Sequence, residues 1–236
     1  MKNKQRVLRD LLIGMFGAAL LMGAEWLLYS LGPGNEKNGL IQSGWAKMPM
    51  WRFEVSMLLC AGGMPLFAIG LHAAVRVVNS ARRKGDVASV RMAELFHLSA
   101  NAAIIGFLFW HTVNIILPVI YKSLFETSLM GAEIFTAVEN IFYVLAIPFY
   151  VYRIVAYAGT SVAVIYFAVV GRLRISKTVL LLNPGVMMLA GWGMQYLHNS
   201  RLSDFASAFG SFGFLLLLAA MIRPVSRRME REGERG

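Results

Sequence analysis

The sequence predicts an all-α fold, a polytopic bundle of transmembrane helices. Three observations predict it. Of the 236 residues 57% are hydrophobic, only 15% are charged, and the mean hydropathy is +0.58. A soluble domain usually carries about a quarter charged residues. The apolar runs approach or exceed the roughly 20 residues needed to cross about 30 Å of hydrocarbon. The basic residues cluster in short segments between alternate runs and at the two ends.

Six spans are expected in one transmembrane domain over residues 1–228. They are residues 11–31, 53–78, 93–120, 146–170, 179–197 and 205–222. The first run follows a basic start and lacks a suitably placed small-residue cleavage site, so we interpret it as a retained helix rather than a signal peptide. Residues 131–145 are either a leading helix of the fourth span or a separate seventh span. Residues 229–236 are charged, and we expect a disordered tail.

Charge asymmetry orients these spans. Lys and Arg are concentrated before the first span, after the second and after the last, and such segments stay in the cytoplasm. Both termini are therefore predicted to be cytoplasmic, which requires an even number of spans and favours six over seven. The net charge of +10 is explained by this orientation, so we expect no nucleic-acid partner. The predicted location is the bacterial cytoplasmic membrane.

Glycines and one proline motif give local expectations. Glycines in three spans favour close contacts between helices. They are Gly14, Gly17 and Gly23 in the first span, Gly62, Gly63 and Gly70 in the second, and Gly191 and Gly193 in the fifth. Asn183-Pro184-Gly185 (183–185) interrupts the predicted fifth span, and a kink or local opening of the helix is expected there.

Polar residues inside the spans are the candidate site, because an ionisable side chain in hydrocarbon is costly unless it is paired. The six-span orientation brings six of them to a similar depth near the outer face: Glu25, Arg52, His111, Asn114, Glu139 and Gln195. If the protein is an enzyme, the expected chemistry is acid–base catalysis, with Glu25 or Glu139 as base and His111 as proton donor. Substrate-binding roles are expected for Arg52, Trp51, Asn114 and Gln195. The alternative is a set of structural ion pairs.

The four histidines allow a different hypothesis, a pair of bis-histidine b haems held by His72, His97, His111 and His198. Their number over six spans resembles the plan of the ascorbate-reducible six-span cytochromes b. That family spreads its ligands over four helices, whereas His97 and His111 share one and lie about 21 Å apart along it. We therefore expect no cofactor, with haem b as the alternative, and no metal site. The single cysteine, Cys60, permits no disulfide within the chain.

The short motifs GAEWLLY, MPMWR, WHT and NPG resemble a family of uncharacterised multi-span bacterial membrane proteins. The resemblance matches Glu25, Trp51-Arg52 (51–52) and His111 to polar positions of that family. Gly23-Ala24-Glu25 (23–25) departs from the pattern, which has Gly-Asp there. The resemblance covers most of the chain and implies no known activity, but it groups the outer polar residues as one unit.

These observations predict an outward-opening polar cavity in the membrane that binds a small or amphipathic ligand from the outer leaflet, with lipid as the other partner. Acid–base transformation of that ligand is one extension. A proton-coupled transporter is an alternative, although no internal repeat is visible. A non-catalytic receptor or assembly factor is another, in which residues 32–50 carry recognition. The sequence does not predict an oligomeric state.

Overall fold

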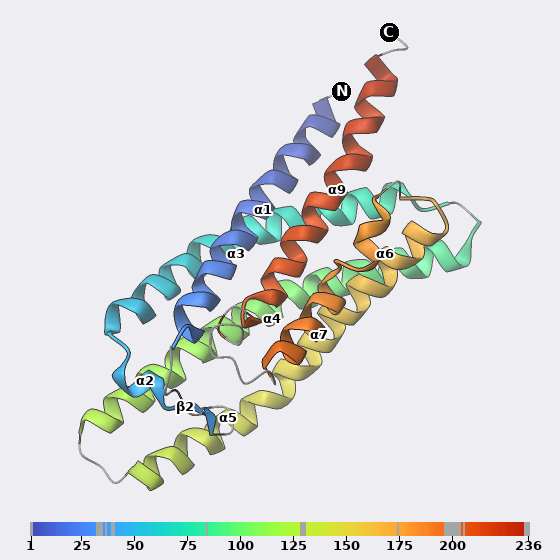
Figure 1. The fold of residues 1–236 in the computed structure, drawn as a ribbon. Helices are drawn as coiled ribbons and strands as arrows, with labels where there is room; N and C mark the ends of the chain where they lie inside the picture. Colours follow the sequence, from blue (N-terminus) through green and yellow to red (C-terminus); the bar gives the residue numbers. More distant parts are fainter. Residues whose placement is uncertain are drawn as a thin grey trace.

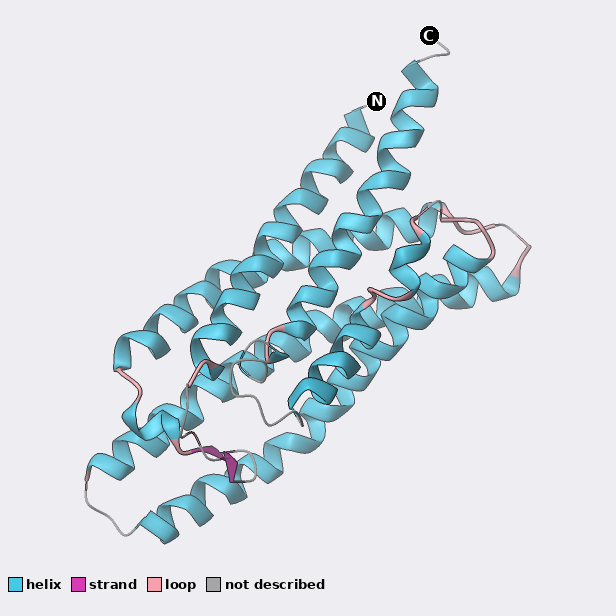
Figure 2. Cartoon of the chain, viewed as in Figure 1, coloured by secondary structure: helices cyan, strands magenta, loops and turns pink. Residues whose placement is uncertain are grey.

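A computed structural model describes residues 2–31, 35, 37–38, 41–83, 85–127, 131–173, 175–195, 204 and 206–233. Helices make up nearly all of it, apart from one short antiparallel strand pair (Figure 2). The helices are α1 (Lys2–Tyr29), α2 (Gly44–Lys47), α3 (Met50–Ser80), α4 (Val87–Glu126), α5 (Gly131–Ile154), α6 (Thr160–Val169), α7 (Pro184–Gln195) and α9 (Phe209–Gly233). Strands β1 (Lys37–Asn38) and β2 (Ile41–Gln42) pair between α1 and α2.

Five helical elements within the described residues are long and apolar enough to cross a membrane. They are Asn3–Tyr29, Met50–Ser80, Val87–Glu126, Thr136–Val169 and Phe209–Ser226. This set indicates a multi-pass membrane protein and overlaps five of the six predicted spans. Both chain termini lie at the same end of the bundle, and the β1–β2 pair lies toward the other end (Figure 1).

Residues 131–145 are helical and lie at the start of α5. They form the first part of α5, which continues through a π-helical turn at Val155–Gly159 directly into α6. Pro148 lies inside α5 without ending it. The segment is thus continuous with one long helical element.

The predicted span 179–197 is not seen as one long helix in the described part of the chain. A short 3₁₀ turn at Lys177–Leu180 is followed by α7, whose 12 residues rise only about 18 Å. The Asn183 side chain accepts a hydrogen bond from the Val186 N–H at 3.1 Å, and Pro184 occupies the first helical position. The Asn-Pro-Gly motif therefore starts a helix, because Asn is a good N-cap and Pro a good first residue.

Helix α9 extends to Gly233, into the residues for which a disordered tail is expected from the sequence.

Glycines bring α1 and α3 into close contact, as predicted. A Cβ placed on Gly14 would lie 2.2 Å from the Cα of Gly70, and one on Gly17 would lie 2.7 Å from the carbonyl oxygen of Gly63. The backbones touch where neither helix has a side chain, which is the usual way for membrane helices to pack. This contact fixes the height of Glu25, farther along α1, relative to α3.

A polar contact joins the connection between α3 and α4 to the segment that follows α6. Asp86 caps the start of α4 by accepting a hydrogen bond from the Ser89 N–H at 3.2 Å, and it also accepts one from the Arg172 guanidinium after α6. The Arg172 hydrogen bond is the main reason why the pKa of the Asp86 carboxyl lies below its ordinary value.

Candidate functional site

A cavity of about 300 Å³ lies among α1, α4, α5, α7 and the start of α9. Nearly half of its described lining residues are aromatic. They include Tyr29, Phe107, Trp110, Phe149, Tyr157 and Trp192. The ionisable carboxyl and guanidinium groups of its described lining belong to Glu25, Arg153 and Asp204. The cavity reaches Asn35 and Gln42, which belong to the connection between α1 and α2 at the end away from the termini.

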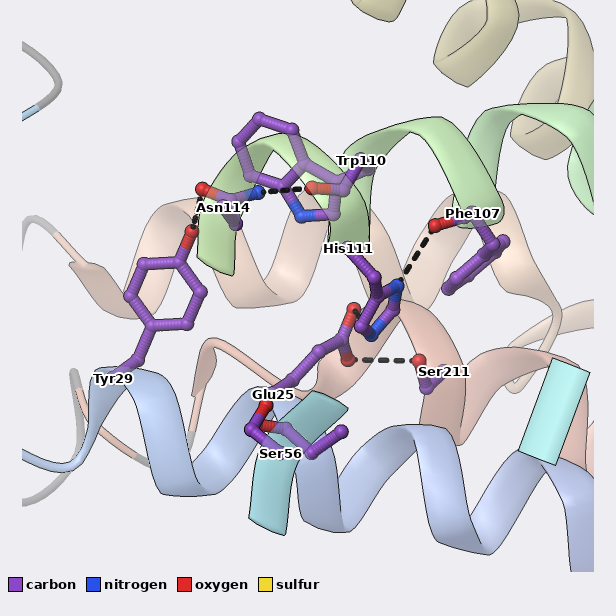
Figure 3. Close-up of polar contacts among 9 residues, drawn as sticks. Glu25, Tyr29, Ser56, Phe107, Trp110, His111, Asn114 and Ser211 are labelled. Carbon is purple, nitrogen blue, oxygen red and sulfur yellow. Dashed lines mark hydrogen bonds and ion pairs between the residues drawn. The ribbon is translucent and has the colours of Figure 1, made fainter. Parts of the chain in front are cut away.

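Glu25 is buried at the inner wall of this cavity, with only 5% of its surface exposed. The Ser211 hydroxyl, on α9, donates a hydrogen bond of 2.7 Å to Oε2. The other carboxyl oxygen, Oε1, lies 3.9 Å from Nε2 of His111 on α4 (Figure 3). Helix α1 is tied down one residue earlier, since the Ser56 hydroxyl of α3 donates to the Ala24 carbonyl at 2.9 Å. Three helices thus hold the carboxyl group in place.

His111 is completely buried and lies behind Glu25, outside the cavity lining. Its Nδ1 is 2.9 Å from the carbonyl oxygen of Phe107, one turn earlier on α4. The imidazole also stacks on the Phe107 ring, with centroids 5.9 Å apart. Its Nε2 has no hydrogen-bond partner and faces Glu25.

A series of hydrogen bonds next to this pair runs from α1 to α4. The Tyr29 hydroxyl donates to Oδ1 of Asn114 at 2.7 Å, and Nδ2 of Asn114 donates to the Trp110 carbonyl at 3.0 Å (Figure 3). Asn114 is 1% exposed and has both ends of its amide engaged. These hydrogen bonds hold Tyr29 at the cavity wall and join the end of α1 to the middle of α4, through residues 85 positions apart in the sequence.

Arg153, near the end of α5, supplies the cavity with a cation. Its guanidinium carbon lies 5.3 Å from the ring centroid of Phe149, 5.7 Å from that of Tyr157 and 5.2 Å from that of Trp192. Its buried Nε has no hydrogen-bond partner, and no carboxylate of the described chain lies within the 4.0 Å of an ion pair. Aromatic faces attract a guanidinium but accept none of its five N–H bonds in the way an oxygen does.

The structure brings together only part of the predicted outer cluster. Glu25, His111 and Asn114 meet as expected. Arg52 does not join them, because its guanidinium donates to the carbonyl oxygens of Leu27 and Ser30 at the end of α1, the second at 2.7 Å. Those carbonyls have no partner within the helix, so Arg52 serves as a C-terminal cap.

Two further predicted residues lie away from the cavity lining. Trp51 is 54% exposed at the start of α3. Glu139 accepts a hydrogen bond of 3.3 Å from the Tyr143 hydroxyl, one turn along on the exposed face of α5. The side chain of Gln195 and the whole of His198 lie outside the described residues.

The described histidines give the haem hypothesis no support. His72 on α3 and His97 on α4 are exposed, whereas His111 is buried against Glu25. Within the described residues there is also no group of three or more His, Cys, Asp and Glu side chains placed to hold a metal ion. The absence of a cofactor and the absence of a metal site both remain predictions.

Arg153 and Ser211 are the site residues that the sequence-based prediction left out. Arg153 carried a usable signal, because an arginine inside a span is a site candidate by default. Ser211 carried none, since a serine in an apolar helix costs little and is common at helix contacts. Its role depends on which carboxylate lies opposite.

Comparison with known families now adds one finding. A family model described as "Family of unknown function (DUF6796)" matches residues 1–226. The chain belongs to the DUF6796 family. This agrees with the predicted resemblance to an uncharacterised family. No curated protein and no solved structure matches this DUF6796 chain. The family assigns no activity, so a function has to be argued from the cavity.

Proposed function

We propose that this DUF6796 protein binds a small amphipathic ligand in the aromatic cavity, with an anionic group of the ligand on Arg153 and its apolar part against the rings. The observation that carries the proposal is the state of Arg153. It has three aromatic neighbours, a buried Nε without an acceptor, and no described carboxylate within ion-pair distance.

The energetics favour an anion at this position. Arginine at the centre of a membrane helix costs about 2.5–3.5 kcal/mol on insertion scales. Each aromatic contact returns about 0.5–2 kcal/mol, which offsets the charge but leaves the buried Nε–H without an acceptor. A carboxylate or phosphate would accept two of these N–H groups in parallel, the arrangement that a guanidinium favours.

We place this cavity toward the outer leaflet. The basic residues near the termini favour a cytoplasmic location for both ends, and the termini lie together at one end of the bundle (Figure 1). The cavity reaches Asn35 and Gln42 at the opposite end. A ligand entering there meets Glu25 on one wall and Arg153 on another. If the ligand is transformed, Glu25 is the residue that would touch it, and His111 would act through Glu25.

The proposal is tested with three probes that share one chain and differ in the head group: octanoate, octanol and octylamine. Binding to the full-length protein in nanodiscs is measured by the quenching of tryptophan fluorescence, since Trp110 and Trp192 line the cavity. Octanoate should bind more tightly than octanol or octylamine. A hydrogen bond to a charged group contributes about 1.5–3 kcal/mol, so Arg153→Gln should weaken octanoate binding roughly ten- to a hundredfold.

The matched control is Arg52→Gln, which removes an arginine of the outer half that contacts only carbonyl oxygens in the described structure. It should leave octanoate binding unchanged. Equal binding of octanoate and octanol to the wild type, or undiminished octanoate binding to the Arg153→Gln protein, would overturn the proposal. If octanoate binds wild type and is also carried across the vesicle membrane, the transporter alternative replaces simple binding.

A further inference from the structure

The buried pair formed by Glu25 and His111 does more than close the inner wall of the cavity. The carboxyl group lines the cavity, while the imidazole is fully enclosed behind it. Their contact joins α1 to α4, and the Ser211 hydroxyl of α9 engages the far carboxyl oxygen. Three helices, α1, α4 and α9, therefore meet at these two titratable groups, and their packing sets the distance between the groups.

The hydrogen bonds fix where the histidine carries its proton. The Phe107 carbonyl can only accept, so the 2.9 Å contact requires a hydrogen on Nδ1 of His111. In a neutral imidazole one nitrogen donates and the other accepts, so Nε2 is then a bare acceptor. This acceptor lies 3.9 Å from Oε1 of Glu25 without a hydrogen bond of ordinary geometry, and the backbone of Leu21 on α1 also interacts with the imidazole.

Two acceptors that face each other repel unless a hydrogen lies between them. The Ser211 hydroxyl already donates to Oε2 of Glu25, which leaves Oε1 as the oxygen without a donor among the described side chains. Leaving a buried acceptor unpaired costs about 1–3 kcal/mol, and more for a charged group. Of the two facing atoms, Nε2 of His111 is the one that is buried without a partner. A single hydrogen placed on either Oε1 or Nε2 would give it one, after a small closure of the gap.

We propose that Glu25 and His111 form a buried binding site that holds one proton between them at neutral pH. The proton is shared either as a carboxylic acid beside a neutral imidazole or as a carboxylate beside an imidazolium. The site faces the cavity through Glu25 alone, so the proton is exchanged by way of the cavity. The proposal concerns the empty protein and does not depend on the ligand proposed for Arg153.

Other ionisable groups surround the pair and bear on its pH dependence. They are Tyr29 on α1, Cys60 on α3, Arg153 on α5, Tyr157 in the π-helical turn and Asp204 before α9. The Arg153 cation favours the carboxylate form of Glu25 and disfavours an imidazolium at His111. Both effects favour release of the proton, and they oppose the cost of leaving buried acceptors without a donor.

Two spectroscopic measurements on the full-length protein in nanodiscs test the proposal. Infrared absorption reports a protonated carboxyl group, and nuclear magnetic resonance of ¹⁵N-labelled histidine reports whether Nε2 carries hydrogen. At pH 7 we expect either a carboxylic acid signal that Glu25→Gln removes, or an imidazolium signal that His111→Gln removes. Together these signals should amount to one proton per chain. The controls Glu139→Gln and His97→Gln, which change exposed or half-buried groups, should leave both signals intact.

A neutral imidazole at His111 together with an ionised Glu25 at pH 7 would overturn the proposal. Should Glu25→Gln or His111→Gln fail to fold, Ser211→Ala provides a second assignment. It removes the donor to Oε2 and keeps both titratable groups, so it should retain the proton and shift only the frequency of a Glu25 carboxyl band. Absence of any such shift, with no imidazolium signal, would equally refute the shared proton.

Discussion

Gly14→Ala tests whether the backbone contact between α1 and α3 holds the bundle together. The added methyl carbon would lie 2.2 Å from the Gly70 Cα and 2.9 Å from its nitrogen, whereas an ordinary contact begins at 3.4 Å. The obstacle is backbone and cannot rotate away, so the helices must separate by roughly an ångström. Overpacking of this kind costs about 1–3 kcal/mol. Because Glu25 is on the same helix, the separation also loosens its contacts with His111 and Ser211.

The matched control is Gly62→Ala in α3, where an added Cβ meets nothing within 4 Å. Alanine is favoured over glycine inside a helix by about 0.5–1 kcal/mol, so this variant should be as stable as the wild type or slightly more stable. The assay is thermal unfolding in one detergent, followed by circular dichroism and by recovery of monodisperse protein. If Gly14→Ala is as stable as Gly62→Ala, the close approach of the two backbones is wrong.

Two other substitutions test polar contacts. Arg52→Gln should lower the free energy of unfolding by about 1–2 kcal/mol, because the carbonyls of Leu27 and Ser30 lose a charged donor; unchanged thermal stability would contradict the cap. Asp86→Asn keeps a capping oxygen for α4 but loses the ion pair with Arg172. Because the folded-state pKa of Asp86 lies below the unfolded value of about 3.9, the stability gap between wild type and variant should persist down to about pH 5 and close as the pH falls further; a gap that does not depend on pH would contradict this.

The sequence was sufficient to predict the helical membrane bundle and part of its site. Long apolar runs determine where helices cross, and the cost of a buried charge points to Glu25 and His111. Depth assigned from orientation then placed Asn114 beside them. These inferences rest on the position of each residue along its own helix, which hydropathy and charge report well.

What the sequence did not predict depends on rotation about the helix axes and on partners far along the chain. Arg52 and Arg153 lie beside and within predicted spans, yet one faces the end of α1 and the other faces aromatic side chains. Depth alone does not separate them. The same limit affected Glu139, whose position along α5 was plausible but whose side chain lies on the exposed face beside Tyr143.

The π-helical turn at Val155–Gly159 divides one long element into two halves with different alignments. One extra residue in a turn rotates everything that follows by about 100° relative to a regular helix. Before the turn, Arg153 faces the cavity; after it, Ser161 faces α7 and accepts a hydrogen bond from the Gly185 N–H at 2.8 Å. A chain shortened by one residue here would become regular, and only one half could keep its partners. Within this element, length is therefore under tighter constraint than the identity of most side chains.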